Sequence, residues 1–307
     1  MAICIDSFGK GEGKGFMVRM KEKETCNTSS QLRAGKKSTL VIIYIILIIC
    51  SLCVLVPLGW LVSSSLKTYA ELTADPWGLP KAFHFENYIS AWKSSKIYRY
   101  LLNSLFVTVL SIVVTVVTCT PLAFILSRYK FKVNRYLYYL VIAGMMVPIH
   151  SVIIPIYMMA GNLNVNNSLW YISFIYGAFR IPFTVFILES FMENIPHEME
   201  ESAFIDGCSI WKMFCHIILP LSRDGVVTIS ILTWLSSWNE LLVSMLLLSK
   251  QELKTLPIGL MGFIDEYGSD YAQLSAGIVI AIAPSIILFA IAQKRIEKGL
   301  TAGSVKG

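Results

Sequence analysis

The sequence predicts an all-α polytopic membrane protein with six transmembrane helices. Hydrophobic residues make up 55% of the 307 residues and charged residues only 15%, whereas a soluble domain carries about 25% charged residues. The apolar residues gather in runs, and about 20 of them are enough to cross the hydrocarbon core as a helix. The six runs lie at 40–62, 101–127, 137–160, 169–191, 217–247 and 274–292.

The runs divide the chain into a membrane domain and two tails. Residues 1–38 are polar and rich in glycine, so we expect a disordered N-terminal tail. The first apolar run lacks a small-residue cleavage pattern after it, which argues against a cleaved signal peptide. Residues 39–293 then form the transmembrane domain and residues 294–307 a C-terminal tail. The fifth run is too long for one span, so we expect it to begin as an interfacial or tilted segment.

The distribution of positive charge predicts the orientation in the cell membrane. Residues 1–39 carry eight Lys or Arg, the loop 128–136 carries four more, and the loop Gly161–Ser168 carries none. The positive-inside rule therefore places both termini in the cytoplasm. The loop 67–100 would lie outside although it holds five basic residues, which is an observation against this topology.

The formal charge of +6 does not indicate a nucleic-acid partner. The basic residues cluster beside the apolar runs, where they would contact anionic membrane lipid instead. No cysteine falls in an outside loop of this topology, so reduced thiols are expected.

No pattern indicates catalysis, a metal or a bound cofactor. The pair Gly35-Lys36 lacks the glycine that a phosphate loop needs at position 30, which is Ser30, so no ATP motif is visible. Metal-ligand spacing and a nucleophile motif are absent too. We therefore expect no catalytic residue and no metal site. The four histidines, which show no such spacing, are His84, His150, His197 and His216.

The loop 192–216 carries the densest polar pattern between two apolar runs. Pro196 favours a helix start, and the three glutamates that follow suit the positive end of a helix dipole. Gly207 can end that helix in a left-handed conformation, and Ser209 can cap a second one. We expect a compact knob of two short helices with Met199, Ala203, Phe204 and Trp211 as its apolar members, which would dock on a partner. The alternative is an amphipathic interfacial helix, against which the glutamates argue.

Two groups of polar residues lie inside the apolar runs. Arg180 lies near the centre of the fourth run, and Trp238, Asn239 and Glu240 lie in the outer half of the fifth. Intramembrane charge is costly and usually functional. These residues could bind a polyol, with the indole stacking on its apolar face, or Arg180 and Glu240 could form a structural pair.

The polar loop resembles a known motif. Glu201-Ser202-Ala203-Phe204-Ile205-Asp206-Gly207, followed by Leu219-Pro220, resembles the EAA loop of ABC-importer permease subunits. Ser237-Trp238-Asn239-Glu240 is similar to the S-W-N-E signature of that family, and residues 299–307 resemble its G-L-x-x-G-A-V-K-G tail, which is typical of the maltose-type carbohydrate branch. Shorter matches are Asn87-Tyr88, Asn103-Ser104, Met146-Val147-Pro148 and Ile181-Pro182-Phe183.

Two positions depart from the family pattern. Ser202 replaces the first alanine of the motif but is also small, so packing should survive. Asp224 stands where the family usually has proline, which removes a helix-entry kink and places an acid beside Arg223. A local cap for the fifth run is the one role that we can suggest for it.

The resemblance implies the type I ABC-importer permease fold and a set of partners. The EAA-type loop would dock on a dimer of ATP-binding cassette ATPases, which bind ATP and magnesium, while this chain binds no cofactor. A second, unlike permease subunit would complete the pathway. The outside loop 249–273 would contact an extracellular or periplasmic solute-binding protein or be a passive connection; its candidate contact residues are Asp265, Glu266, Tyr267 and Asp270.

The competing function is a self-contained secondary transporter or channel for a small polar solute. Such a protein would need paired membrane acids or an inverted repeat within the chain, and neither is visible in the sequence. The pattern does not name the sugar: mono-, di- and oligosaccharides, alditols and glycerol phosphates all remain open.

Overall fold

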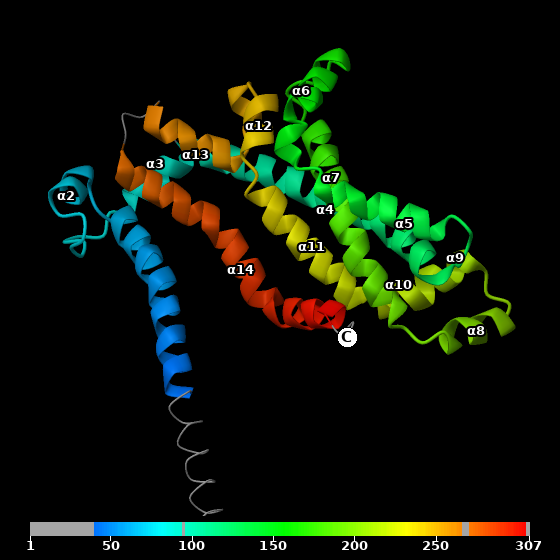
Figure 1. Ribbon diagram of the computed structural model, residues 1–307. Coiled ribbons are helices and arrows are strands. Elements are labelled where there is room, and N and C mark those ends of the chain that lie inside the picture. The colour runs from blue at the N-terminus through cyan, green and yellow to red at the C-terminus, as the bar shows by residue number, and fades with distance from the viewer. Residues whose placement is uncertain (1–39, 94–95, 266–269, 305–307) are drawn as a thin grey trace, which may run out of the picture. The chain divides into compact units, whose positions relative to one another are not determined.

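The prediction of an all-α fold is confirmed. A computed structural model of the protein describes the backbone of residues 40–93, 96–265 and 270–304, and the side chains of 40–93, 96–263 and 270–293. Within these ranges the regular elements are helices (Figure 1). Four of them are long and apolar enough to cross a membrane: Leu40–Ser65, α4 (Ile97–Arg128), α7 (Leu169–Glu193) and α14 (Tyr271–Ser304), whose apolar part is Tyr271–Gln293.

These four helices correspond to apolar runs one, two, four and six, but the count of six spans is not reproduced. A bent pair in run five raises the number of spans to at most five in the described part of the chain. The last helix also continues through residues 294–304, which we expected to be a separate tail. Glu, Lys, Arg and Ile at 294–298 are compatible with a helix, and no proline follows Pro284 to end it.

Run three is broken rather than continuous. Pro148 has no amide hydrogen, and it restricts the preceding Val147 to an extended conformation, which the structure shows at φ −89° and ψ 104°. The helix therefore stops before this pair and restarts after it. The resulting segments are α5 (Asn134–Ala143), η1 (Gly144–Met146), η2 (Ile149–Ser151) and α6 (Ile153–Asn162).

Run five is bent. The helices Ile210–Leu221 and Arg223–Trp238 meet at an angle of 73°. Ser222 between them has ψ 6°, outside the helical range, and the nearby Pro220 supplies no amide hydrogen. The expectation that this run begins with a segment separate from the span fits the bend. Its parts are α9 (Ile210–Met213), the π-helix η3 (Phe214–Ile218), α10 (Leu219–Leu221), α11 (Arg223–Trp238) and α12 (Leu242–Leu247).

The loop 249–273 contains more regular structure than we expected. A ten-residue helix, α13 (Leu256–Asp265), begins within it, and its Leu256, Ile258 and Phe263 are buried against neighbouring helices. The proline at position 257 is tolerated because the first turn of a helix needs no amide donor there. The remaining short elements are α2 (Tyr69–Ala74), α3 (Glu86–Lys93), α8 (Glu198–Ile205) and η4 (Gln251–Leu253).

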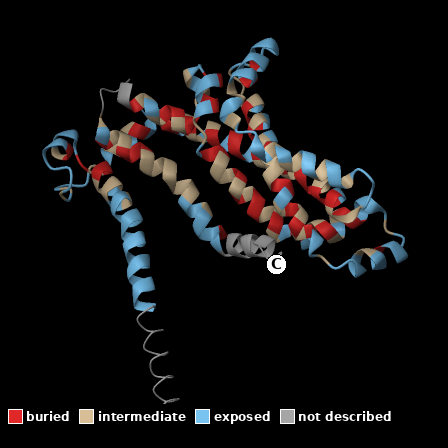
Figure 2. Ribbon diagram, viewed as in Figure 1, coloured by how far each residue is buried: buried red, intermediate tan, exposed pale blue. Residues whose placement is uncertain are grey.

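The described residues fall into two units, which divide between Leu61 and Val62. Within the larger unit, buried residues are concentrated along α4, α7 and α11 (Figure 2). One core cluster joins Phe124 of α4, Leu188 and Met192 of α7, and Phe214 of η3. By contrast, the apolar part of the helix Leu40–Ser65 has none of its residues buried.

Small residues bring α4 and α7 close together. Ser111 Oγ donates to the carbonyl of Ser173 at 3.1 Å, and Thr115 Oγ1 donates to the carbonyl of Gly177 at 3.4 Å. A Cβ on Gly177 would lie only 2.7 Å from Cγ1 of Val114. Small residues and hydroxyl bonds of this kind hold helices together in membranes, where apolar surface alone gives no preference for protein over lipid.

We expect Gly177→Leu to separate α4 from α7 and to destabilise the fold by roughly 1–3 kcal/mol, the usual cost of overpacking. Gly177→Ala should cost less, because it adds one carbon, although that carbon would still lie 3.0 Å from Cβ of Val114. The matched control is Gly59→Leu, since no atom lies within 4 Å of a Cβ at that position. The melting temperature and monodisperse fraction of the detergent-purified protein measure the effect, and equal values for the two leucine variants would contradict it.

Two asparagines fasten loops to helix ends. Asn103 Nδ2 donates to the carbonyls of Glu252 and Lys254 at 2.9 and 3.0 Å, and the neighbouring Ser104 Oγ accepts from the amide of Leu256. Asn87 Nδ2 donates in the same way to the carbonyls of 65 and 67 at 2.9 and 2.8 Å. The Asn103-Ser104 and Asn87-Tyr88 pairs of the sequence thus act as backbone anchors.

Candidate functional site

The loop 192–216 folds as two short helices, as its residues predict. Helix α8 carries Glu198, Glu200 and Glu201 in its first turn, where the helix dipole favours acids. Ser202 Oγ donates to the carbonyl of Glu198 at 2.8 Å, so the serine at this position completes a local bond of the helix. The replacement of the family's alanine by Ser202 therefore leaves α8 intact.

A left-handed glycine separates the two helices. Gly207 has φ +74°, its amide donates to the carbonyl of Phe204 at 3.0 Å, and the amide of Cys208 donates to the carbonyl of Ala203 at 2.9 Å. This pair of bonds is the Schellman motif that ends helices at glycine. Ser209 then caps α9 by accepting from the amide of Lys212. The predicted helix stop and helix start are both confirmed.

The side chains of this loop divide into a buried and an exposed set. Ala203 is only 6% exposed and belongs to the core cluster, so our expectation that it would face a partner is wrong for its side chain. Phe204, Ile205 and Trp211 are 54%, 86% and 66% exposed. We call the exposed set the α8–α9 apolar surface: Met199, Phe204, Ile205, Ile210 and Trp211.

Around this surface lie exposed acids, and the Leu-Pro pair is elsewhere. Glu201 and Asp206 are exposed on α8 and at its end. Leu219 and Pro220 are in α10, directly before the 73° bend, rather than on the α8–α9 apolar surface. The EAA-type motif is therefore divided: residues 201–207 lie in the exposed knob, and Leu219-Pro220 lies next to the bend.

Arg128, the last residue of α4, holds the start of α8. Its Nη2 donates to the carbonyls of Met192 and, at 2.7 Å, of Ile195. Its Nε lies 2.8 Å from Glu200 Oε1 in an ion pair whose N–H is not aligned on the oxygen, with the two side chains 1% and 12% exposed. Burial, together with the Glu200 carboxylate, raises the pKa of the Tyr129 phenol next to it.

The structure brings Arg180 and Glu240 to one cavity of about 220 Å³ between α7, α11 and the break in run three. No ion pair joins the two side chains in the part of the chain whose side chains are described, so the expected structural pair is not formed. The cavity is lined by Val147, Ile149, Tyr176, Phe179, Arg180, Ser236, Ser237 and Glu240.

Glu240 is instead bonded within its own surroundings. Its two carboxylate oxygens accept from the amides of Val243 and Ser244, at 3.0 and 3.2 Å, and so cap the start of α12. The hydroxyl of Tyr176 also donates to Glu240 and hydrogen-bonds with the hydroxyl of Ser244. This leaves the guanidinium of Arg180 as the cavity's charged group without an ion-pair partner among the described side chains.

Trp238 and Asn239 do not line the cavity. The indole of Trp238 is buried, stacks on Trp234 with ring centroids 5.1 Å apart, and donates to the carbonyl of Ala281 in α14. Asn239 is exposed and donates to the carbonyl of Leu235. Arg180 and Glu240 thus line the cavity, whereas Trp238 and Asn239 point elsewhere.

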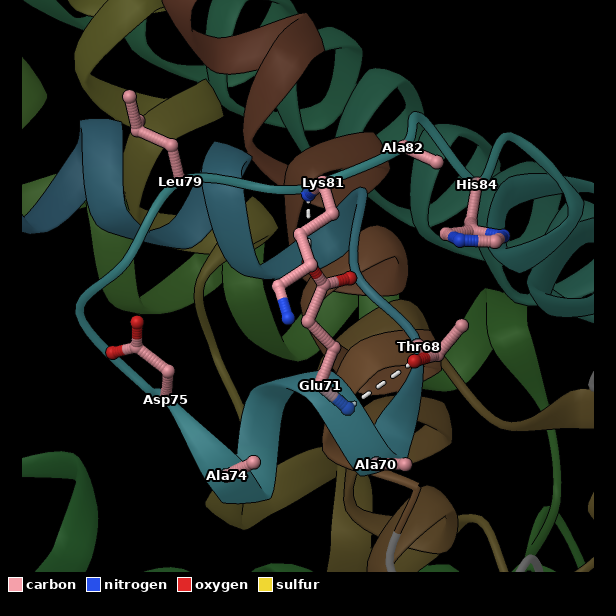
Figure 3. Close-up of a pocket in the computed structure, with 9 residues that line it drawn as sticks. All are labelled: Thr68, Ala70, Glu71, Ala74, Asp75, Leu79, Lys81, Ala82 and His84. Carbon is pink, nitrogen blue, oxygen red and sulfur yellow. Dashed lines mark hydrogen bonds between the residues drawn. The ribbon is translucent and has the colours of Figure 1, made fainter.

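A second cavity of about 430 Å³ lies between α2 and the segment that follows it (Figure 3). Its acids already accept backbone amides: Glu71 from Lys81 at 2.6 Å, and Asp75 from Gly78 at 2.9 Å. These bonds shape the loop itself, and sequence reasoning had not singled out the segment.

The candidate residues of the loop 249–273 are only partly described. Asp270 Oδ1 accepts from the amides of Ala272 and Gln273, at 3.0 and 3.2 Å, and caps α14. Asp265 is the last residue of α13, and its side chain is not described. Glu266 and Tyr267 lie outside the described residues.

Asp224 does not form the side-chain cap that we suggested. It lies in the first turn of α11, where an acid suits the helix dipole, but that helix has no side-chain cap bond. Its carboxylate is 3.9 Å from the exposed guanidinium of Arg223, a separation at which a surface pair contributes little.

Sequence reasoning missed three residues of the site. Arg128 and Tyr176 bond carbonyl and carboxylate partners 64 positions away along the chain, and the hydroxyl of Ser244 bonds Tyr176, 68 positions away. The one local signal was the arginine in the last turn of a long apolar helix, where a cation suits the helix dipole.

Long apolar helices, a broken span beside a polar cavity, and a knob that is anchored on a span define a helical membrane transport subunit. The chain belongs to the family described as the binding-protein-dependent transport system inner membrane component, which matches residues 119–302. It is thus a multi-pass inner-membrane transport component rather than an enzyme.

Similar proteins cover most of this chain. It is 37% identical, over 89% of both chains, to the probable ABC transporter permease protein YurM of Bacillus subtilis (strain 168). It is 32% identical to the diacetylchitobiose uptake system permease protein NgcG of Streptomyces coelicolor (strain ATCC BAA-471 / A3(2) / M145), over 85% of this chain and 87% of that one.

A solved structure supports the fold. A chain in the crystal structure of a bacterial ABC transporter involved in the import of the acidic polysaccharide alginate superposes with a TM-score of 0.75. The match covers 83% of this chain and 95% of that chain at 24% identity. The prediction of an ABC-importer permease fold is confirmed.

Proposed function

We propose that this chain is one of two unlike permease subunits of an ABC importer for carbohydrates. A dimer of separate ATPases would bind ATP and magnesium, and an external binding protein would deliver the solute. The observation that carries the proposal is the α8–α9 apolar surface, an exposed knob whose base is fixed to the end of α4. Family membership supports the same assignment.

The proposed topology places both termini and the α8–α9 apolar surface in the cytoplasm. Arg128 ends α4, and Lys130, Lys132 and Arg135 follow it on the side where α8 is anchored. The positive-inside rule favours the cytoplasm for such a cluster. The exposed acids of α8 would be repelled by anionic lipid there, which favours a protein partner over the membrane surface.

Docking on an ATPase would bury the exposed aromatics of the knob. Burial of one side chain of the size of Phe204 or Trp211 contributes roughly 1.5–3 kcal/mol. Glu201 and Asp206 would then lie at the rim of the contact, where charges set orientation and partner choice. Gly207 fixes the angle between the two halves, and Leu219-Pro220 joins the knob to the bend before α11.

Carbohydrate is the proposed class of solute because uptake of a sugar is named for a relative such as the diacetylchitobiose permease. In the cavity, the guanidinium of Arg180 can donate to solute hydroxyls, and the ring of Phe179 can contact the apolar face of a pyranose. Glu240 lines the cavity and is held in place by the amides at the start of α12. Trp238 and Asn239, which we first considered as solute contacts, do not line the cavity, so any effect of theirs on the solute would be indirect.

The proposed binding-protein contact lies between α13 and α14. Asp265, Glu266, Tyr267 and Asp270 connect these helices, and Asp270 would fix the start of α14 through its cap. The alternative function, a self-contained secondary transporter, would require coupling-ion ligands. Among the described residues, no three His, Cys, Asp or Glu side chains are grouped to hold a metal ion.

A purification in mild detergent tests the proposal. The tagged subunit is recovered from its native membrane, and its partners are identified by mass spectrometry. We expect a second permease and an ATPase. Recovery of the folded chain alone, with solute uptake retained in liposomes, would favour the secondary transporter.

Arg180→Ala should lower solute uptake about tenfold, because a hydrogen bond from a charged donor contributes roughly 1.5 kcal/mol or more. Arg180→Lys should lose less, since it keeps a donor in the cavity. The matched control is Arg99→Ala, an exposed arginine of α4 whose ion pair with Glu252 spans 3.8 Å. Uptake of radiolabelled solute at equal amounts of subunit measures the effect, and wild-type uptake by Arg180→Ala would exclude the residue from the pathway.

A further inference from the structure

Both halves of the α8–α9 knob are attached to the same turn of α4. Arg128 contacts the first half through the carbonyls of Met192 and Ile195 and the carboxylate of Glu200. Its Nη1 also lies 3.3 Å from Nδ1 of His197. One side chain that is almost fully buried thus joins four groups between the end of α7 and the first turn of α8.

The second half is attached through aromatic rings that pack at a tilt. Phe214, directly after α9, packs on Phe124 of α4 with ring centroids 5.1 Å apart. Trp211 of α9 packs on Phe214 at 5.4 Å. Since 124 and 128 are one helical turn apart, the rings and the arginine hold the knob at one place on α4.

We propose that Arg128 is a positioning residue for coupling: it clasps α8 to α4, so that movement of the docked knob is carried directly into the α4–α7 pair. The inference rests on the proposed function, because it concerns how ATPase movement would reach the membrane helices. Arg128 is not part of the EAA-type motif, because it lies 73 positions before Glu201.

The contact between Arg128 and α8 matters because the two chain segments that connect the knob to the membrane helices are irregular and would transmit movement poorly. On one side, residues 194–197 between α7 and α8 are not helical. On the other side, the chain passes through the π-helix Phe214–Ile218 and then the 73° bend. Helix α4, by contrast, runs unbroken for 32 residues and is hydrogen-bonded to α7 at two levels. Because the packed rings attach the α9 half of the knob, a push on the α8 half reaches α4 directly through the Arg128 clasp.

The experiment compares Arg128→Gln and Glu200→Gln with variants of nearby charged residues that take no part in the Arg128–Glu200 contact. The matched controls are Arg135→Gln, an exposed cation in the first turn of α5, and Glu198→Gln, an exposed acid in the same turn as Glu200. Each variant is purified with its partners and reconstituted in liposomes. ATPase recovery, ATP hydrolysis and solute transported per ATP are measured.

We expect Arg128→Gln to keep the ATPase bound and active within about twofold, while solute transported per ATP falls at least about fivefold, the lower range of coupling effects. Glu200→Gln should lose less, because the carbonyl contacts of Arg128 remain. The double variant should be no worse than Arg128→Gln alone. Unchanged solute per ATP in Arg128→Gln, or additive losses in the double variant, would overturn the proposal.

A second measurement separates this inference from the proposed function. If the wild-type subunit recovers no ATPase, the proposed function fails, and the clasp is then judged on the subunit alone. Amide exchange of α8 should be at least about tenfold faster in Arg128→Gln than in wild type or Arg135→Gln. Equal exchange rates would show that Arg128 does not hold α8.

Discussion

Gly207→Val is expected to abolish solute uptake and to release the ATPase, although the subunit remains in the membrane. The φ of +74° at this position is a region that β-branched residues rarely adopt. Because no atom lies within 4 Å of a Cβ built there, the penalty is backbone strain rather than a clash. Strain of about 1–3 kcal/mol would be relieved by turning α8 away from α9, which disrupts the α8–α9 apolar surface.

Gly207→Asn is the matched control, since asparagine tolerates the left-handed region better than other non-glycine residues. We expect it to retain most ATPase binding, with Gly207→Ala between the two. Co-purification of the ATPase at equal amounts of subunit provides the measurement. A ranking in which valine binds the ATPase as well as asparagine would disprove a role for the turn.

Glu240→Ala is expected to have the second large effect, on stability and on uptake together. The substitution would leave the amides of Val243 and Ser244 and the hydroxyl of Tyr176 without the carboxylate that they bond. An unpaired buried polar group costs about 1–3 kcal/mol, so the start of α12 should loosen and the cavity wall should lose its shape. Glu240→Gln keeps one acceptor oxygen and should be intermediate.

The neighbouring Asn239→Ala provides the control for Glu240, because its side chain is exposed and bonds only the carbonyl of Leu235 within its own helix. Thermal unfolding in detergent and uptake in liposomes are both required. A stable Glu240→Ala variant that fails in uptake would assign the carboxylate to the solute rather than to α12.

The length of the apolar runs predicted the straight spans but not the broken ones. Runs two and four became α4 and α7 because their prolines, Pro121 and Pro182, are accommodated inside the helices. Run three broke at Pro148, where the residues around Val147 become extended instead. In each case a proline lies within a long apolar run, so a hydropathy profile does not distinguish the run that breaks from the runs that stay helical.

The site divides in the same way between local and distant interactions. The caps and turn of the α8–α9 knob were predictable because Ser209 and Gly207 act on backbone groups within five positions of themselves. The roles of Glu240 and Arg128 depend on partners from other helices, so the sequence left Glu240 between a solute contact and a pair with Arg180, and gave Arg128 no role in the site. A contact of the Trp238 indole with solute was one alternative for the same reason, since only the fold shows Ala281 beside it.

The break in run three also bears on how transporters of this kind could change their solutes. Helices α5 and α6 have ten residues each, about 15 Å in length and half the thickness of a bilayer. The irregular stretch between them would therefore lie at mid-depth, where exposed backbone is tolerated only against protein or water. Because Val147 and Ile149 of this stretch line the cavity, the break in the helix forms part of the cavity wall. Evolution can then exchange the side chains opposite this wall, and with them the preferred sugar, without rebuilding the passage.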